Sequence, residues 1–198
     1  MCLVGFSMGG NITLKYLGEE GPHVDPRIKK AVAISTPTSL QDCAESLSSG
    51  VSSLYTRHFI LRMVKKLKIK KQQFEDFNPN LFQLAKLSDF KDFDDKITAP
   101  INGFTDAHDY WNQASSLQFL PHIKVKSLII NAKNDPFLKG RCYHYQELEG
   151  HPFVDLETPE QGGHVGFVEE GLHKKVWTES RVPQFFLDWQ VTFSFLST

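Results

Sequence analysis

Long hydrophobic runs, paired cysteines and an excess of charge are all missing from this 198-residue chain. No apolar stretch approaches the roughly 18 residues that cross a bilayer, and no segment has the pattern of a signal peptide. The cysteines are odd in number and far apart, which argues against a disulfide framework and favours a reducing compartment. They are Cys2, Cys43 and Cys142. We therefore expect a cytoplasmic protein.

Several binding chemistries also lack their sequence signals. With 22 basic and 23 acidic residues the formal net charge is −1, so no global field attracts nucleic acid or an acidic membrane. The histidines form no His-Glu-x-x-His pattern and the cysteines no paired spacing, which disfavours a metal site. Gly162-Gly163 lacks the Lys-Ser/Thr ending of a phosphate loop, which disfavours nucleotides. The sequence predicts no metal, no cofactor and no nucleic-acid partner.

What the chain does have is a nucleophile-elbow pattern at its start. A short apolar strand leads into Gly5-Phe6-Ser7-Met8-Gly9, a Gly-x-Ser-x-Gly, and then into a helical pattern. A strand that turns into a helix within two or three residues brings two backbones together, so we expect Gly5 and Gly9 to be required for steric reasons. This layout predicts Ser7 as a nucleophile on a strained turn, with the backbone N–H of Met8 donating to an oxyanion. The alternative is a structural turn with an idle serine.

The helix after the elbow is expected from about residue 11, with one apolar face. That face consists of Ile12, Tyr16 and Leu17. Residues 28–35, 126–131 and 151–157 read as further strands, two of them apolar on both faces as buried parallel strands are. Residues 177–195 have the spacing of a packing helix, with Val182, Phe185, Phe186 and Trp189 as its apolar residues.

Between residues 38 and 122 no buried strand appears, and that length is far beyond an ordinary connection. We therefore predict a core formed by 1–37 and 122–198, with an inserted helical cap at 38–121. Ile60, Val64 and Leu67 have helical spacing, and basic residues crowd the other face from Arg57 to Lys71. That face is either simply solvated or makes weak contact with a membrane surface.

Phenylalanines are dense in the second part of this insertion. They form either an apolar roof over a site or a core within the insertion itself. They are Phe74, Phe77, Phe82, Phe90 and Phe93.

Two further residues complete a catalytic constellation with Ser7. Asp135 follows the strand at 126–131, and His164 follows the strand at 151–157 within a glycine-rich loop. The chain order Ser, Asp, His is the order used when a nucleophile elbow is paired with a triad. In this hypothesis His164 takes the Ser7 proton and Asp135 orients the imidazole. The alternatives are that Asp135 caps the turn before Pro136 and that His164 is an ordinary loop histidine.

Taken together, these motifs resemble the YheT-like branch of the α/β-hydrolases, which is related to the eukaryotic abhydrolase proteins. The matching segments are Gly5–Asn11, Gly103–Phe104 with Asp106 and Asp109–Tyr110, Ile129–Phe137, and Gly162–Phe167. The resemblance implies a carboxylesterase or lipase-like serine hydrolase acting on a small acyl ester or lipid-like substrate. It also implies a Ser7, Asp135, His164 triad and no cofactor.

The resemblance covers only the carboxyl-terminal half of that family's fold. The family has about eight strands in the order 1-2-4-3-5-6-7-8, so we expect a truncated α/β fold: a parallel sheet of about four strands, five to eight, with flanking helices and the inserted cap. The elbow strand would then be a bare edge, covered by a missing amino-terminal half or a partner chain. Any amino-terminal anchor would lie in the missing part.

The same departure leaves three functional readings open. A second oxyanion donor, which the family takes from the loop after strand three, would be absent, and losing one such donor costs on the order of 3 kcal/mol in the barrier. Besides an esterase, the sequence therefore allows an acyltransferase that uses the same triad, or an inactive fragment that serves as a binding module.

Overall fold

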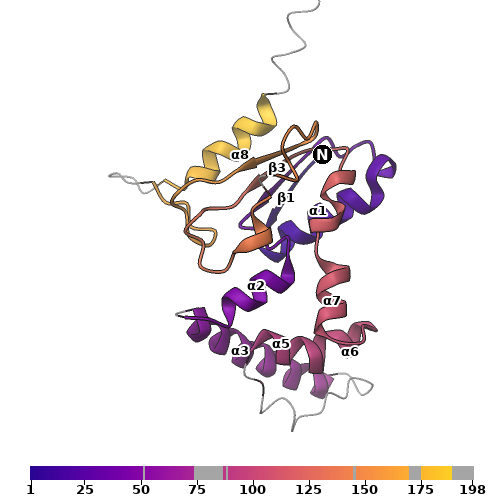
Figure 1. Ribbon diagram of the computed structural model, residues 1–198, viewed down its shortest axis with the longest axis vertical. Coiled ribbons are helices and arrows are strands. Elements are labelled where there is room, and N and C mark those ends of the chain that lie inside the picture. Colours follow the sequence, from indigo (N-terminus) through magenta and orange to yellow (C-terminus); the bar gives the residue numbers. More distant parts are fainter. Residues whose placement is uncertain (51, 74–86, 88, 145, 170–174, 189–198) are drawn as a thin grey trace, which may run out of the picture. The chain divides into compact units, whose positions relative to one another are not determined.

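The computed structural model describes residues 1–50, 52–73, 87, 89–144, 146–169 and 175–188. Its internal contacts divide the chain into two compact units (Figure 1). One, the sheet unit, contains Met1–Thr38 and Ser115–Thr198; the other, the helical unit, contains Ser39–Ala114. The sheet unit thus resumes at Ser115, earlier than the expected boundary at residue 122.

The sheet unit alternates strands and helices along the chain. Its elements are β1 (Cys2–Phe6), α1 (Met8–Glu20), η1 (Gly21–His23), β2 (Lys30–Ile34), η3 (Leu117–His122), β3 (Lys126–Ile130), η4 (Gly140–Cys142), β4 (Val154–Glu157) and α8 (Trp177–Leu187). The strands form one parallel sheet in the order β1-β2-β3-β4. The predicted α/β class, a parallel sheet of four strands with flanking helices, is confirmed.

Both faces of the sheet carry a hydrophobic core, because side chains alternate between the two faces along each strand. On one face Ala31, Ala33 and Ile129 pack with Leu14 and Leu17 of α1. On the other face Val32, Ile34, Leu128 and Ile130 pack with Phe185 of α8. Figure 1 shows α1 and α8 on opposite sides of the strands. This double cover explains why β2 and β3 are apolar on both faces.

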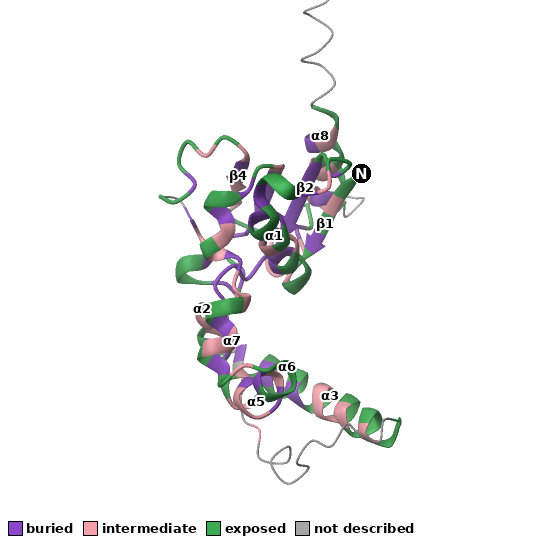
Figure 2. Cartoon of the chain, turned by 90° about the vertical axis from the view of Figure 1, so that its right-hand side faces the viewer, coloured by how far each residue is buried: buried purple, intermediate pink, exposed green. Residues whose placement is uncertain are grey.

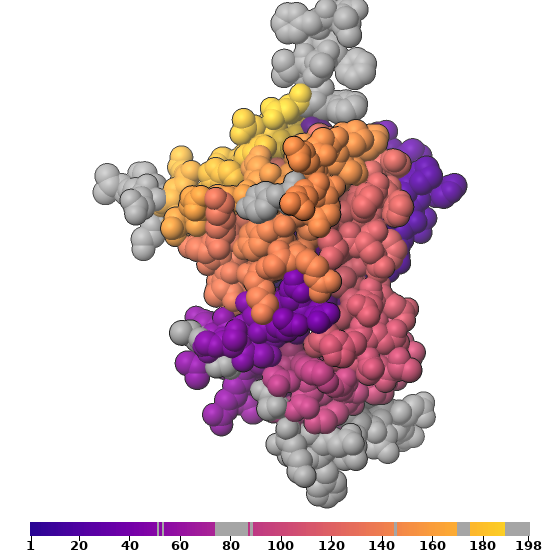
Figure 3. Space-filling model, in the orientation of Figure 1, coloured from indigo at the N-terminus to yellow at the C-terminus, as the bar shows by residue number. Residues whose placement is uncertain are grey.

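The short η3 helix belongs with this core rather than with the insertion. Leu120 and Ile123 are fully buried and join the cluster around Leu14. The side-chain oxygen of Asn11 accepts a hydrogen bond from the Ser116 N–H at 2.8 Å. The indigo residues of the chain start and the salmon residues of this segment consequently lie side by side on the surface (Figure 3).

The expected inner face of the first helix was wrong in part. Leu14 and Leu17 are fully buried, whereas Ile12 and Tyr16 are 61% and 38% exposed. The helix also begins at Met8, earlier than expected. Apolarity alone misassigned the stripe, because this helix has apolar side chains on both its covered and its uncovered face.

The helical unit contains five α-helices and one π-helical turn in its described residues. They are α2 (Leu40–Leu47), α3 (Ser52–Gln73), α5 (Phe90–Phe93), η2 (Asp94–Thr98), α6 (Ala99–Asn102) and α7 (Ala107–Ala114). Two small cores hold it together. Leu40 and Ala44 pack with Ala107 and Trp111, and Phe93 and Ile97 pack with the Val64 and Leu67 side chains of α3.

Of the predicted phenylalanine cluster, Phe93 is buried inside the helical unit and Phe90 packs on the core around Trp111. Both therefore contribute to packing within their own unit. Phe74, Phe77 and Phe82 lie outside the described residues, as does Trp189. Within the described ranges, every helix is too short or too polar to traverse a lipid bilayer.

Candidate active site

Ser7 stands at the junction of β1 and α1, where the chain reverses direction. It is the N-cap residue of α1 with a backbone φ of 50°, a region that residues with side chains seldom adopt. Its N–H donates to the Ile34 carbonyl at 2.8 Å, which fixes the turn against the end of β2. The predicted strained elbow is thus the local geometry of this residue.

The glycines around Ser7 differ in how tightly they are packed. A Cβ on Gly5 would lie 2.5 Å from the Gly9 carbonyl oxygen, so the expected steric need for glycine holds at this position. At Gly9 the expectation was wrong, because a Cβ there meets nothing within 4 Å. The second crowded position is Gly10, whose added Cβ would lie 2.0 Å from Thr36 Oγ1. Gly10, not Gly9, faces the loop that follows β2.

The structure brings Ser7, His164 and Asp135 together. His164 Nε2 lies 3.0 Å from Ser7 Oγ, and His164 Nδ1 lies 2.9 Å from Asp135 Oδ2. Since the carboxylate can only accept, Nδ1–H donates to Asp135 and Nε2 is left to accept the Ser7 hydroxyl proton. The side chain of His164 is 18% exposed and that of Asp135 is fully buried. All three residues follow the carboxyl ends of parallel strands, so they meet on one edge of the sheet.

The second carboxylate oxygen of Asp135 also accepts a hydrogen bond. Its Oδ1 accepts from the Phe137 N–H at 2.9 Å, which closes the turn around Pro136. The Phe137 ring lies 4.5 Å, centroid to centroid, from the His164 ring. The carboxylate therefore caps a turn and faces the imidazole at the same time, so the two roles considered for it are compatible.

The loop that carries His164 is fastened on both sides of the imidazole. The Gly163 N–H donates to Asn134 Oδ1 at 2.8 Å, and the Val165 N–H donates to Ser35 Oγ at 2.9 Å. Ser35 is fully buried after β2, and Asn134 directly precedes Asp135. Two side chains from neighbouring strand ends thus fix the backbone on either side of His164.

Asn131 ties together the loops that surround this edge. Its Oδ1 accepts from the Thr36 N–H at 2.7 Å, while its Nδ2 donates to the carbonyls of Thr36 and Cys142 at 3.1 and 2.9 Å. The side chain is fully buried, so these bonds replace those that the loop backbone would make with water. The end of β3 consequently holds the segments after β2 and around η4 in place.

Met8, predicted as the oxyanion donor, is the first residue of α1. The first N–H groups of a helix have no acceptor within the helix, and the helix dipole places partial positive charge there. The Met8 N–H next to Ser7 therefore has the position that the prediction requires, and the role itself stays a prediction.

Sequence reasoning did not identify Ser35 as part of this site. It is a serine after a buried strand and carries no motif, so only the folded loop shows its contact with Val165. Asn131 and Asn134 belong to the segment that carries the family resemblance, yet no role was predicted for either. The position of Asn134 directly before a predicted catalytic carboxylate is the sequence feature that could have indicated its role.

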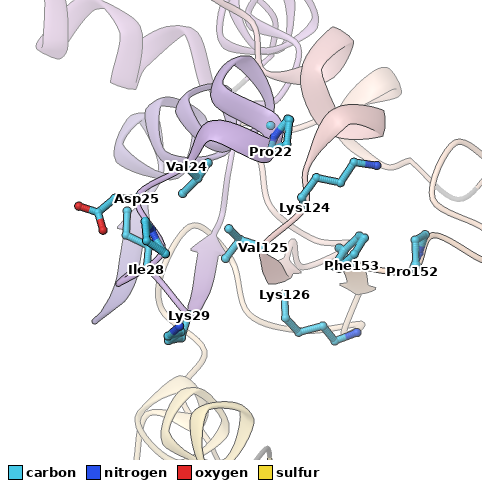
Figure 4. A pocket seen from close by; sticks show the side chains of 12 residues that line it. Pro22, Val24, Asp25, Ile28, Lys29, Lys124, Val125, Lys126, Pro152 and Phe153 are labelled. Carbon is cyan, nitrogen blue, oxygen red and sulfur yellow. The ribbon is translucent and has the colours of Figure 1, made fainter.

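One sizeable pocket lies well away from the triad. It has a volume of about 390 Å³ and is lined by residues that precede strands, including Lys29, Val125 and Phe153 (Figure 4). Triad and pocket therefore occupy opposite edges of a parallel sheet. Two of its three lysines have local partners: Lys126 pairs with Asp155, and Lys124 lies over the Phe153 ring. In the described part of the chain, no three His, Cys, Asp or Glu side chains gather as metal ligands would.

Comparison with known proteins identifies the family to which the chain belongs. The sequence pattern of the alpha/beta hydrolase fold family matches residues 1–171. The chain is 36% identical to YheT of Escherichia coli strain K12, over 96% of this chain and 54% of YheT. It is 28% identical to a monoacylglycerol lipase of Saccharomyces cerevisiae, over 89% of this chain and 40% of the lipase.

A solved structure shares the fold. The esterase Pf2001 of Pyrococcus furiosus superposes with a TM-score of 0.50 at 17% identity, over 96% of this chain and 53% of the esterase. The chain spans about half the length of the relatives that it matches. On the evidence of its matched sequence and its sheet, the chain belongs to the alpha/beta hydrolase fold family, within which it is similar to YheT.

Proposed function

We propose that this chain carries the nucleophile, base and orienting carboxylate of a serine esterase that cleaves carboxylic esters of lipid-like substrates. Ser7 is the nucleophile, His164 the general base and acid, and Asp135 the residue that orients the imidazole. The names of the relatives, which include a monoacylglycerol lipase, support an acyl ester as the substrate class.

One observation carries this proposal: an unbroken path of two contacts from Ser7 Oγ through the imidazole to Asp135. The distances of 3.0 and 2.9 Å are within hydrogen-bond reach, which a general base must satisfy before its basicity matters. An idle serine and an ordinary loop histidine have no reason to meet in this order on a strained turn.

In the proposed reaction, His164 Nε2 takes the proton from Ser7 as Oγ attacks the ester carbonyl carbon. The carbonyl oxygen becomes an oxyanion that the Met8 N–H stabilises. The imidazolium then gives its proton to the leaving alcohol, and the acyl group remains on Ser7. Water attacks the acyl-enzyme with His164 again as base, which releases a carboxylic acid and restores Ser7. Asp135 orients the imidazole and stabilises the imidazolium throughout.

A fluorophosphonate probe tests the nucleophile without knowledge of the natural ester. The wild-type chain is expected to be labelled covalently, and Ser7→Ala to lose labelling completely. His164→Ala is expected to slow labelling strongly, and Asp135→Asn to slow it by roughly 10⁴-fold because the imidazole loses its orienting acceptor. Ser180→Ala is the matched control, since Ser180 is an exposed serine on α8. Absence of labelling in the folded wild-type chain would overturn the proposal and favour the binding-module reading.

Substrate class is tested separately on chains that label. A series of p-nitrophenyl esters with increasing acyl length is expected to give turnover that Ser7→Ala abolishes. Product analysis with and without an added alcohol distinguishes hydrolysis from acyl transfer, because both share the acyl-enzyme and differ in the second acceptor. Predominant ester exchange in the presence of alcohol would replace the esterase assignment with the acyltransferase.

A further inference from the structure

The long helix α3 holds a concentration of positive charge found nowhere else in the sequence. Its 22 residues, Ser52–Gln73, include seven lysines and arginines and no acidic residue. The formal net charge of −1 for the whole chain is therefore +7 on this helix and −8 on the remainder. Such segregation produces a local positive field although the molecule as a whole is nearly neutral.

The same helix exposes large apolar side chains, which a purely solvated basic face does not need. Leu54 is 70% exposed and Leu61 62% exposed, and further apolar residues with more than 40% exposure are Tyr55, Phe59 and Ile69. Figure 2 shows green, exposed residues along much of α3, with pink, intermediate residues between them.

The charges and the exposed apolar residues share one face of the helix. Ile60 is buried, and Val64 and Leu67 pack on the core formed by Phe93 and Ile97, which fixes the inward stripe. At 100° per residue, Leu61, Leu54 and Ile69 project about 100°, 120° and 180° away from Ile60, so they lie along one flank and the back of the helix. Exposed basic residues lie among them and on both sides of them, namely Arg57, Arg62, Lys65, Lys66, Lys68 and Lys70.

We infer that this outward face of α3 docks on an anionic lipid surface. Cations of the face meet lipid phosphates, while Leu54, Leu61 and Ile69 enter the boundary between headgroups and acyl chains. The long lysine stems let the ammonium groups reach the headgroups while the aliphatic side chains insert. A nucleic-acid backbone would match the charge but offers no apolar layer for three aliphatic side chains. The docking does not depend on Ser7 chemistry.

Vesicle flotation tests this directly. The full chain carrying Ser7→Ala, so that no lipid is cleaved, is mixed with vesicles of phosphatidylcholine alone or of equal parts phosphatidylcholine and phosphatidylglycerol. We expect flotation with the anionic vesicles, little with the neutral ones, and release as salt is raised. Equal flotation with both vesicles, or none with the anionic vesicles, would refute the docking.

Matched variants assign the binding to α3. Lys65→Glu with Lys66→Glu is expected to lower the partition coefficient by about thirtyfold or more, because each basic residue contributes about fivefold. Lys29→Glu with Lys124→Glu changes the net charge equally, but on exposed lysines of the sheet unit, and should have a small effect. A similar loss in both pairs would mean that only the net charge matters, and would sink the assignment.

The apolar half of the face has its own variant. Leu54→Asn with Leu61→Asn keeps every charge and is expected to weaken flotation by about tenfold, because two exposed apolar side chains no longer enter the lipid. Circular dichroism and the fluorophosphonate labelling of the same variant in the Ser7 background check the fold and the active site independently. Unchanged flotation, together with tight binding of a labelled oligonucleotide, would identify a nucleic-acid surface instead.

Discussion

At the scale of single residues, backbone strain gathers around the triad. Within the described ranges, four residues other than glycine have positive φ: Ser7, Ser35, Val165 and Phe167. The first is the proposed nucleophile, the second accepts from the third, and the last closes the His164 loop by donating its N–H to the Gly162 carbonyl at 2.8 Å. Strained residues persist only where the surrounding structure fixes them, and they concentrate at functional sites.

The elbow glycines give a matched pair of substitutions. Gly5→Ala places a Cβ 2.5 Å from a backbone oxygen that cannot move independently, so we expect a loss of about 1–3 kcal/mol in the free energy of unfolding. Gly9→Ala meets open space within a helix and is expected to be neutral or to add about 0.5–1 kcal/mol. Urea unfolding followed by circular dichroism measures both. Equal losses in the two variants would contradict the packing described for the elbow.

The Ser35 hydroxyl is expected to set the position of the imidazole. Ser35→Ala leaves the Val165 N–H without its acceptor, so the loop relaxes and the fluorophosphonate labelling rate should fall by about 10- to 100-fold. Asn134→Ala should act in the same direction through Gly163, whereas Asn134→Asp keeps the accepting oxygen and should retain more of the rate.

Ser127→Ala is the control for Ser35. Ser127 is also fully buried and donates to the Val125 carbonyl, but it lies near the amino end of β3, away from the triad. It should cost stability without changing the labelling rate. If Ser35→Ala labels as fast as this control, the hydroxyl has no part in positioning His164.

At the scale of elements, the π-helical turn η2 buries a carboxyl group in the helical unit. Asp94 accepts from Trp111 Nε1 at 2.8 Å and from Thr98 Oγ1 at 2.6 Å. Burial raises the pKa of Asp94, and these two hydrogen bonds lower it only in part. Burial, assisted by the Asp94 charge, also raises the pKa of the neighbouring Tyr110 to about 12.

This burial predicts a pH dependence of stability. Because the folded-state pKa of Asp94 lies above the ordinary value of 3.8, its contribution is fully present below that value and is lost as pH rises through the raised pKa. Asp94→Asn keeps the shape and an accepting oxygen but does not titrate. We expect its stability to fall less between acidic and neutral pH than that of the wild type, as measured by urea midpoints across a pH series.

Asp109 in α7 is expected to give a pH dependence of stability with the opposite sign. Hydrogen bonds from the Thr105 N–H, the Gln113 amide and the Thr105 hydroxyl lower the pKa of this carboxyl. Its contribution is therefore present above pH 3.8 and is lost as pH falls through the lowered pKa. Asp109→Asn should cost stability at neutral pH and little at strongly acidic pH. The same slope for both variants would be incompatible with the contacts described.

The elements themselves were largely predictable from local sequence. The strands β2 and β3 are short apolar runs bounded by turn residues. Such runs are typical of parallel strands that are buried on both faces. The inward face of α1 was not predictable, because Ile12 and Tyr16 are apolar but exposed. Sequence records which residues are apolar, whereas the neighbouring elements decide which of them are covered.

At the scale of the whole molecule, the proposed triad was predictable because topology, not local sequence, brings it together. Ser7, Asp135 and His164 each follow a strand of one parallel sheet, so all three lie at the same edge, and the loop after β4 carries His164 across to Ser7. The contacts of Ser35 and Asn134 depend on the detailed path of the loop at 162–167, which no spacing rule describes. The elbow strand β1 forms one edge of the sheet, as expected, and a partner that covers it stays a prediction.

The separation of the two sheet edges also determines where a label can be attached to the molecule. The strands are parallel, so all of them end at the edge that carries Ser7. The turns at the other edge, around Pro26 and Pro152, are exposed and lie at least about one strand length from Ser7. A fluorophore, spin label or affinity tag attached at these turns therefore lies away from the reacting atoms and should not obstruct them.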